Sequence, residues 1–580
     1  MTRRLFALCA AALVFASTAF AAAPSVEMKR PTAPTPATHE AMIVAADPRA
    51  AQAAKAMLDQ GGDAVDAAIA AMAVLGLVEP QSAGVGGGGF LLYYDHRSSD
   101  VTAFDGREAA PAGATPQYFF GDDGKPLPFP LAVASGRSTG APTLYAMLKL
   151  AHEKRGRLPW AKLFEPAIKL ADEGFVVSPR MSASIAAMAG RSALKLDPAA
   201  RAYLFQSDGT PLPAGYLLKN PQYAATLRSL ASEGPKALQD GPIADAIIAA
   251  VHQAPRPGIL TKADLAAVSP HMDWAVCGAY RTYKVCGAPP PTSGGVAVID
   301  ILGLFARARP RPAGPQDPDD WASFMWASRV AYADRDYYLA DARKVPVPVK
   351  GLIAPRYLDE RAKVIRASEV APAVIAPGAP AGAPLGRWGA PGPATDAGTT
   401  HMSIIDKDGD AVAMTASIEA PFGSERMAAG FFLNNQLTDF SRDPELNGKP
   451  VANAVAAFKK PRSSMAPTMV FDRQGKLYAV IGSPGGSSII AYVAKAIIGV
   501  VDWRLTMQQA VDLPNVVAMG PRVAIERDRF PAGANAVLSA RGWQLVPSAG
   551  EISGLNGILV TPQGLDGGAD SRREGVALKD

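Results

Sequence analysis

The run Asp396-Ala397-Gly398-Thr399-Thr400-His401-Met402-Ser403-Ile404-Ile405-Asp406 marks the sharpest change of composition in this chain. A stretch rich in Pro, Ala and Gly, residues 367–398, leads into it, and a strand pattern leads out of it. A Gly followed by Thr at such a boundary predicts a cleavage site. If the chain is cut there, Thr399 becomes an N-terminal residue that carries both a hydroxyl and an amine, a self-contained nucleophile and base.

The residues after this junction predict a β-hairpin. Residues 402–406 alternate, residues 407–410 form a turn that contains a Gly, and residues 411–418 alternate again. Further strands are expected at 90–94, 274–287 (a pair), 469–471, 477–481 and 557–560, and helices at 64–77, 142–154, 159–173, 221–232, 243–251, 316–340 and 489–502. Segments that open with strands and continue with helices predict an α+β fold, with sheets sandwiched between helical layers.

Composition places the chain among ordinary globular proteins. Of its 580 residues, 48% are hydrophobic and 19% are charged, which excludes disorder throughout the chain. The net charge is +5, from 58 basic and 53 acidic residues that are well mixed. Because no run of Lys and Arg resembles a nucleic-acid-binding stripe, no nucleic-acid partner is expected. His152-Glu153 lacks the second His of a zinc helix, and neither a metal nor another cofactor is expected.

The N-terminus is typical of an export signal. Arg3 and Arg4 precede an apolar run at 5–15, and Ala19-Phe20-Ala21 is a small-x-small cleavage site. A general export signal and a twin-arginine signal both remain open. We expect a signal peptide at 1–21, a flexible leader at 22–40, and an exported protein that is periplasmic or secreted. No other apolar run reaches the ~20 residues that span a bilayer, so no membrane span is expected after signal removal.

Three cysteines are present, and Cys9 would leave with the signal. Cys277 and Cys286 remain and lie across the predicted strand pair. In an oxidising compartment they can form a disulfide, and two separate buried thiols are an equally good interpretation. Neither interpretation predicts a metal site or a thiol nucleophile.

Two motifs match known site patterns by letter only. The run Gly84–Gly89 fits G-x-G-x-x-G, but a helix is predicted before it and a strand after it, the reverse of a dinucleotide site. Ser138 stands in a G-x-S-x-G pattern without the flanking strand and helix of a nucleophile elbow. His401 is expected on the same strand face as Thr399, where it either assists catalysis or is an ordinary hydrogen-bonded histidine.

The turn at Gly485-Gly486 is a third site-like feature, because it precedes a predicted helix. Its backbone N–H groups can point at one spot and hold an oxyanion, although a simple strand-to-helix turn also fits the sequence. By themselves, Ser463-Ser464 fits a polar loop and Arg107 fits a surface ion pair. Each of these signals is weak alone.

Taken together, several ordered motifs resemble those of the gamma-glutamyltransferase (glutathione hydrolase) family over residues 40–575. They are Thr399–Gly409, Leu433–Phe440, Pro461–Thr468, Gly482–Gly486, Gly84–Phe90, Phe104–Glu108, Pro289–Gly295 and Tyr332–Arg335. The resemblance implies an N-terminal-nucleophile hydrolase with a four-layer αββα sandwich, made as a precursor and cleaved between Gly398 and Thr399. It further implies a large subunit at 41–398 and a small catalytic subunit at 399–580, which together form a heterodimer.

The resemblance also implies an activity. Thr399 would attack the γ-glutamyl amide of glutathione or a related compound, and the resulting ester would pass the acyl group to water, an amino acid or a dipeptide. Ser417 would support the nucleophile, and Gly485 and Gly486 would form the oxyanion hole. The implied ligands of the donor's α-carboxylate are Arg107, Ser463 and Ser464. Those of its α-ammonium are Glu419, Gln436 and Asp439.

The chain departs from the family pattern in three places. Ser417 replaces a Thr but keeps the hydroxyl, and Glu419 stands where several members have Asn, although a carboxylate also suits an ammonium. Segment 441–460 looks short and lacks the tyrosine of the lid seen in some members, so an open cleft would admit bulkier donors and favour hydrolysis. The alternatives are an acylase of the same fold that acts on glutaryl-type or poly-γ-glutamyl amides, and an unprocessed, non-catalytic binding protein.

Overall fold

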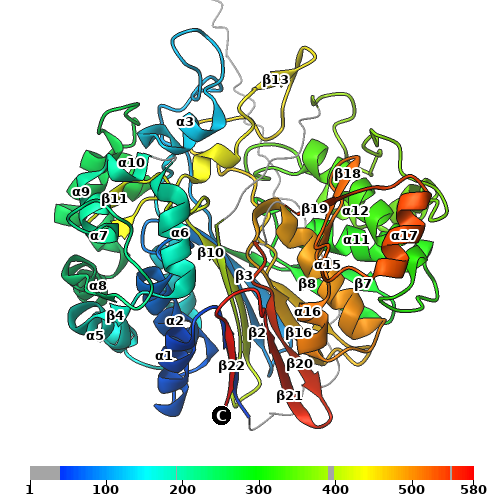
Figure 1. Cartoon of the computed structure of the whole chain (residues 1–580), viewed down its shortest axis with the longest axis horizontal. Helices are drawn as coiled ribbons and strands as arrows, with labels where there is room; N and C mark the ends of the chain where they lie inside the picture. Colours follow the sequence, from blue (N-terminus) through cyan, green and yellow to red (C-terminus); the bar gives the residue numbers. More distant parts are fainter. Residues whose placement is uncertain (1–39, 191–192, 390–397, 549–551) are drawn as a thin grey trace, which may run out of the picture.

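The computed structural model describes residues 40–190, 193–389, 398–548 and 552–580. Two β-sheets lie side by side in the middle of the molecule, and helices cover the outer face of each (Figure 1). This arrangement confirms the predicted α+β fold with four αββα layers. The predicted signal peptide, the leader up to residue 39 and residues 390–397 of the predicted linker lie outside the described residues.

The hairpin predicted after the junction lies in the middle of the first sheet. Strands β9 (Thr400–Ile405) and β10 (Ala411–Ser417) pair antiparallel, with Ile405 opposite Ala411. Within the described residues this sheet has the order β22-β1-β9-β10-β2-β3-β6. The other strands are β22 (Val576–Lys579), β1 (Met42–Ala45), β2 (Gly88–Asp95), β3 (Asp100–Gly106) and β6 (His271–Trp274).

Alternation along β9 separates two cores. Met402 and Ile404 pack with helices α1 (Pro48–Asp59) and α2 (Ala64–Val78), whereas Ile405 belongs to the core that includes the second sheet. His401 and Ser403 alternate with Met402 and Ile404 along the strand. Their side chains point between the sheets, because successive side chains of a strand face opposite ways. Strand β9 is therefore packed on both of its faces.

The second sheet supplies the turn that faces the junction. Its order among the described strands is β21-β20-β16-β15-β8-β7. These are β21 (Gly564–Ala569), β20 (Asn556–Thr561), β16 (Leu477–Gly482), β15 (Thr468–Phe471), β8 (Tyr283–Gly287) and β7 (Val276–Tyr280). Its outer helices include α11 (Gly294–Ala308), α12 (Pro318–Tyr338), α15 (Ile489–Val501) and α16 (Met507–Asp512). Strand β16 runs into the predicted turn and then α15.

The helices predicted between residues 142 and 251 are present. They are α4 (Leu144–Arg155), α5 (Glu165–Glu173), α8 (Pro221–Glu233) and α9 (Gly241–Val251). The single helix predicted over 159–173 is wrong in one respect, since its first part is the 3-10 helix η2 (Trp160–Phe164). Pro166 lacks the N–H that would continue one α-helix through this segment.

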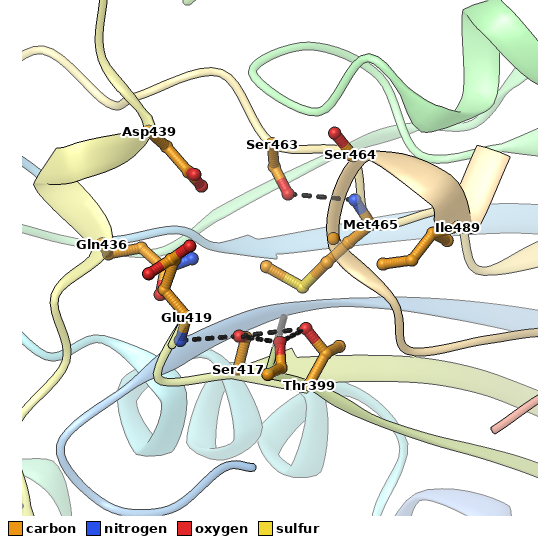
Figure 2. A pocket seen from close by; sticks show the side chains of 11 residues that line it. Thr399, Ser417, Glu419, Gln436, Asp439, Ser463, Ser464, Met465 and Ile489 are labelled. Atoms are coloured by element: carbon orange, nitrogen blue, oxygen red, sulfur yellow. Dashed lines mark hydrogen bonds between the residues drawn. The ribbon is translucent and has the colours of Figure 1, made fainter. Parts of the chain in front are cut away.

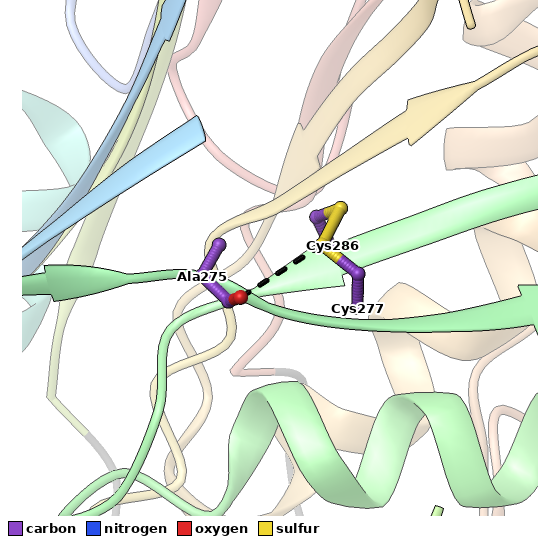
Figure 3. Close-up of a disulfide and its surroundings, with 3 residues drawn as sticks. All are labelled: Ala275, Cys277 and Cys286. Carbon is purple, nitrogen blue, oxygen red and sulfur yellow. Dashed lines mark hydrogen bonds between the residues drawn. A yellow bond between two sulfur atoms is a disulfide. The ribbon is translucent and has the colours of Figure 1, made fainter. Parts of the chain in front are cut away.

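Cys277 and Cys286 form a disulfide between two neighbouring strands (Figure 3). They face each other in the register of β7 and β8. Their spacing left open a disulfide or two separate thiols, and the structure contains the disulfide.

The glycine run Gly84–Gly89 allows close packing of backbones. It follows α2 and enters β2, the order that argued against a dinucleotide site. A β-carbon on Gly87 would lie 2.3 Å from the carbonyl oxygen of Ser417, and one on Gly88 would lie 2.3 Å from that of Gly106. In the ranges that the structure covers, no helix is both long and apolar enough to cross a membrane.

Candidate active site

Two hydroxyl groups, those of Thr399 and Ser417, contact the carbonyl oxygen of the predicted cleavage bond between Gly398 and Thr399. The hydroxyl of Thr399 contacts the carbonyl oxygen of Gly398 and lies 3.1 Å from Oγ of Ser417. Oγ of Ser417 donates to the same Gly398 carbonyl at 3.0 Å and accepts from the N–H of Glu419 at 2.8 Å. The register of β9 and β10 brings these residues together, because Thr400 pairs with Ala416 and the next residues at this end of the hairpin are Thr399 and Ser417.

A small pocket opens over these hydroxyls. Figure 2 shows Thr399 and Ser417 on one side of it and Asp439 and Ser463 on the other. The residues that line it are Gly398, Thr399, Ser417, Glu419, Gln436, Asp439, Ser463, Ser464, Met465, Gly486 and Ile489. Nearly all of the site residues predicted from the sequence therefore meet in one place, although they come from segments far apart in the chain.

The turn between β16 and α15 has an unusual backbone conformation. Gly485 and Gly486 have φ values of +131° and +55°, which side-chain-bearing residues adopt only with strain. No described residue accepts a hydrogen bond from the N–H of either glycine. Gly486 lines the pocket, and Gly485 directly precedes it in the chain. Unpaired N–H donors beside a pocket can stabilise a negative charge.

On the other side of the pocket, Arg107 forms an ion pair with Asp439. Arg107 is fully buried, and it also donates to the backbone carbonyls of Pro461 at 3.1 Å and Arg462 at 3.3 Å. Its Nη1 has no hydrogen-bond partner in the described part of the chain. Arg107 thus lies behind Asp439 rather than among the lining residues.

The carboxyl of Glu108, next to Arg107, is kept neutral by its surroundings. Burial raises the pKa of Glu108 to about 8, against the opposing effect of the Arg107 charge. At neutral pH the charged pair in this corner is therefore Arg107 with Asp439.

The remaining polar side chains of the pocket are held by their neighbours. Arg335 donates to Oγ of Ser464 at 2.5 Å, and the amide of Asn435 donates to the carboxylate of Glu419. Glu419 has a φ of +81°, a left-handed conformation that is uncommon for a residue with a side chain. Oε1 of Gln436 has no partner in the described ranges. The pocket thus combines hydroxyls, amides and carboxylates around one open space.

Two residues weighed from the sequence lie elsewhere. His401 is buried, and its ring nitrogens lie 2.8 Å from Oγ1 of Thr415 and 3.2 Å from Oγ of Ser403. Burial lowers the pKa of His401 to about 3, so its ring is neutral at physiological pH. The hydroxyl of Ser138 donates to the carbonyl of Ser135 at 2.7 Å. Both match the ordinary structural interpretation, and neither lines the pocket.

Sequence reasoning missed three residues of this region. Met465 and Ile489 line the pocket, and each directly follows or closely follows a segment that the sequence had singled out. Arg573 donates to the carbonyl of Thr399 at 3.2 Å, and no local pattern indicated it. Across the described ranges, no group of His, Cys, Asp or Glu side chains has the arrangement needed to hold a metal ion.

Comparison with known proteins gives a consistent result. Residues 50–579 match the family model described as Gamma-glutamyltranspeptidase. The chain is 32% identical to a glutathione hydrolase proenzyme of Bacillus subtilis (strain 168), covering 93% of this chain and 91% of that protein. It is 34% identical to the glutathione hydrolase proenzyme of Escherichia coli (strain K12), covering 92% and 90%.

Acylases are among the similar proteins too. The acylase ACY 1 proenzyme of a Pseudomonas species (strain SE83) is 32% identical, with 93% of each chain covered. The crystal structure of a cephalosporin acylase from Bacillus halodurans superposes with a TM-score of 0.81 and 25% identity over 97% of this chain and 99% of that one.

Proposed function

The chain belongs to the gamma-glutamyltranspeptidase family, and from that premise we propose that it is a self-processing gamma-glutamyltransferase with glutathione hydrolase activity. Its donors are glutathione and related γ-glutamyl compounds. The acyl group passes through an ester on Thr399 to water, an amino acid or a dipeptide. The observation that carries this proposal is the meeting of Thr399, Ser417 and the Gly398 carbonyl in one pocket that also contains Asp439.

Maturation begins in the precursor. Oγ1 of Thr399 attacks the carbonyl carbon of Gly398, the C–N bond breaks, and the released amine takes up the hydroxyl proton. Water then hydrolyses the ester and leaves a carboxylate on Gly398 and a free amine on Thr399. Ser417 supports both steps by donating to the carbonyl oxygen, on which negative charge develops. The products are a large subunit at 41–398 and a small subunit at 399–580, held together as a heterodimer.

Export precedes or accompanies this maturation in our proposal. The signal at 1–21 directs the chain out of the cytoplasm, and the leader at 22–40 separates it from the first strand. The protein is then periplasmic or secreted. The disulfide between Cys277 and Cys286 supports this location, since disulfides persist in oxidising compartments.

Turnover uses the new N-terminus. The α-amine of Thr399, with a reference pKa of about 8, takes the hydroxyl proton as Oγ1 attacks the γ-carbonyl of the donor. The N–H groups of Gly485 and Gly486 stabilise the oxyanion, and the amine then protonates the leaving nitrogen. Water or an amine acceptor repeats the sequence on the ester.

Donor recognition relies on opposite charges at the far side of the pocket. Arg107, Ser463 and Ser464 hold the α-carboxylate in this proposal. It is supported by Nη1 of Arg107, which has no hydrogen-bond partner among the described residues. The α-ammonium is held by Asp439, Gln436 and Glu419, whose oxygens line the pocket. A glutaryl group has no α-ammonium, so it would not supply the cationic group that Asp439 and Glu419 bind in this proposal.

The first test concerns processing. On a denaturing gel the purified protein is expected to give two bands, the smaller with the N-terminal sequence Thr-Thr-His. A single band near the mass of the whole mature chain would support the non-catalytic binding protein instead. Thr399→Ala is expected to abolish processing, and cleavage that persists in this variant would refute the role of Thr399.

The second test separates the two enzyme classes. Cleaved protein is incubated with a γ-glutamyl anilide, with and without glycylglycine, and in parallel with a glutaryl anilide. Release of the chromogenic amine from the γ-glutamyl donor is the expected result, and acceleration by glycylglycine measures transfer. Turnover of the glutaryl amide alone would identify an acylase, the activity named for two of the similar proteins.

A further inference from the structure

One arginine side chain connects the nucleophile to the second sheet. Arg573, in the turn between β21 and β22, donates to three backbone carbonyls. These belong to Thr399 at 3.2 Å, Ile552 at 2.6 Å and Ser553 at 2.7 Å. Because one planar guanidinium makes all three bonds, the carbonyl of Thr399 has a fixed position relative to segment 552–553.

The same side chain is packed against the oxyanion turn. A β-carbon on Gly554 would lie 2.6 Å from Cγ of Pro484 and 2.7 Å from Cδ of Arg573. Gly554 is thus enclosed between the Arg573 side chain and the residue that directly precedes Gly485. Arg573 therefore contacts the nucleophile residue directly and the oxyanion turn through Gly554.

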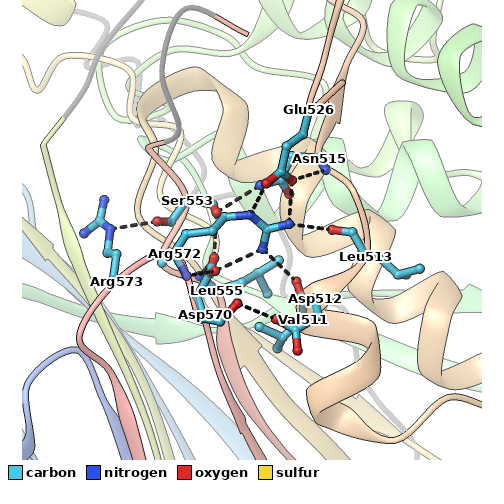
Figure 4. Close-up of polar contacts among 12 residues, drawn as sticks. Val511, Asp512, Leu513, Asn515, Glu526, Ser553, Leu555, Asp570, Arg572 and Arg573 are labelled. Carbon is cyan, nitrogen blue, oxygen red and sulfur yellow. Dashed lines mark hydrogen bonds and ion pairs between the residues drawn. The ribbon is translucent and has the colours of Figure 1, made fainter. Parts of the chain in front are cut away.

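The charge of Arg573 is not neutralised by a direct ion pair in the part of the chain that the structure describes. Its neighbour Arg572 behaves differently, because it pairs with Glu526 at 2.5 Å and Asp570 at 3.0 Å (Figure 4). Burial and the Arg180 charge lower the pKa of Arg573 to about 9, which still leaves it cationic at neutral pH. Among the described residues, the positive charge beside Thr399 thus has no directly bound anion.

We propose that Arg573 is a positioning residue for Thr399, which anchors the cleaved chain end by its carbonyl and keeps the neighbouring α-amine in its free-base form. The inference rests on the proposed function. Cleavage removes the covalent tether on the N-terminal side of Thr399, so the carbonyl bond to Arg573 becomes a principal restraint on that end. The amine lies three bonds from this carbonyl oxygen, within the field of the guanidinium.

Other charges act on the same amine. The carboxylates of Glu419 and Asp439 line the pocket and favour the protonated amine. Arg573 faces Arg180, Glu79, Asp570 and Tyr492, of which Arg180 adds positive charge and the carboxylates oppose it. Without the Arg573 charge, the carboxylates have the larger effect on the pKa of the Thr399 amine. Coulomb's law then predicts a rise of at least about 0.5–1 unit in the pKa of the amine.

The test compares three variants of the processed enzyme with the unaltered protein. Arg573→Met removes the charge and the hydrogen bonds. Arg573→Lys keeps the positive charge but loses the planar set of three guanidinium donors. Arg572→Met removes an adjacent arginine that points away from Thr399. The readout is the acidic limb of the pH profile of kcat/KM for a γ-glutamyl anilide, since this limb reports the free amine. Near-UV circular dichroism and the processed fraction on a gel are measured alongside.

The expected result is an acidic limb raised by at least about 0.5–1 unit in Arg573→Met, with the limb unmoved in Arg573→Lys and Arg572→Met. A folded but uncleaved Arg573→Met, together with a cleaved Arg573→Lys of lower kcat, also supports the proposal.

Two results overturn it. One is a cleaved Arg573→Met with an unshifted limb and kcat within about twofold of the unaltered protein. The other is an unfolded Arg573→Met whose Lys counterpart matches Arg572→Met in every readout. If the unaltered protein itself fails to cleave or to release the anilide, the proposed function fails, and this outcome is distinct from both.

Discussion

The imidazole of His401 packs so closely on the backbone of Gly482 that a β-carbon on Gly482 would lie 2.1 Å from Cε1 of the ring. His401 belongs to β9, two residues after the proposed nucleophile Thr399, and Gly482 ends β16, just before the proposed oxyanion turn. The contact therefore sets the separation of two strands in different sheets at the point where the site needs both. Asn556 strengthens it by donating to the His401 carbonyl at 2.8 Å.

Gly482→Ala is expected to push the ring of His401 away and to change this separation. Overpacking of a closed site costs about 1–3 kcal/mol of stability, and kcat should fall more than KM changes, because the oxyanion turn shifts relative to Thr399. Thermal denaturation and steady-state kinetics measure both effects. Gly520→Ala is the matched control, since a β-carbon there meets nothing within 4 Å. Equal behaviour of the two variants would contradict this role of the contact.

The buried His401 also predicts how stability depends on pH. Burial lowers its pKa from the ordinary value of 6.5 to about 3. Between these values the unfolded chain binds a proton that the folded chain does not, so stability is complete above pH 6.5 and falls as the pH drops toward 3. The loss at pH 5 is about 2 kcal/mol. His401→Gln should remove it, so that urea unfolding at pH 7.5 and pH 5 differs less in the variant. Parallel pH dependences in both proteins would argue against it.

The strands around the junction could be predicted because their pattern is local. Alternation in 402–406 and a glycine-bearing turn specify a hairpin whatever surrounds it. The pairing of Cys277 with Cys286 could not be decided, since a spacing of nine residues suits both a disulfide and two thiols until the register of β7 and β8 places them opposite each other. The number of residues between two cysteines does not show how their strands pair.

Site residues divide in the same way. The Gly485-Gly486 turn was noted because paired glycines before a helix leave a local trace, whereas Ser417 came only from the family resemblance. Arg573 leaves none, because its importance arises from three carbonyl groups that folding gathers, one of them 174 residues away along the chain. The position of Arg107 behind Asp439 was likewise beyond the sequence, since burial depends on how the 461–462 backbone covers the guanidinium.

Gly398 has no room for a side chain. A β-carbon there would lie 2.1 Å from the carbonyl oxygen of Glu419, a backbone atom that cannot rotate away. Gly398→Ala is therefore expected to displace the scissile carbonyl from Ser417. Self-cleavage should slow at least about tenfold, because this weakens an oxyanion contact whose complete loss costs about 10²–10³-fold. The uncleaved fraction is followed on denaturing gels after expression and during incubation. Gly520→Ala should cleave normally, and cleavage of Gly398→Ala at an unchanged rate would contradict the geometric argument.

Ser417 is expected to act in both cleavage and turnover through one hydroxyl. Ser417→Ala removes the donor that lies 3.0 Å from the Gly398 oxygen and should slow self-cleavage by about 10²–10³-fold. Ser417→Thr keeps the hydroxyl and should cleave at a rate close to that of the unaltered protein. Rates come from time courses of the purified precursor. A Thr variant as slow as the Ala variant would show that the size of the side chain, not its hydroxyl, matters here.

Asp439 should matter for the donor but not for maturation, because it lies across the pocket from Thr399 and pairs with Arg107. Asp439→Asn leaves a buried guanidinium without its anion, which costs about 3–5 kcal/mol of interaction and removes the partner of the donor's ammonium. We expect kcat/KM for a γ-glutamyl anilide to fall at least about 100-fold, with self-cleavage intact and any glutaryl amide turnover changed much less. Asp443→Asn, an exposed carboxylate on the same segment, is the control. An equal loss on both amides would place Asp439 in the catalytic step rather than in recognition of the ammonium.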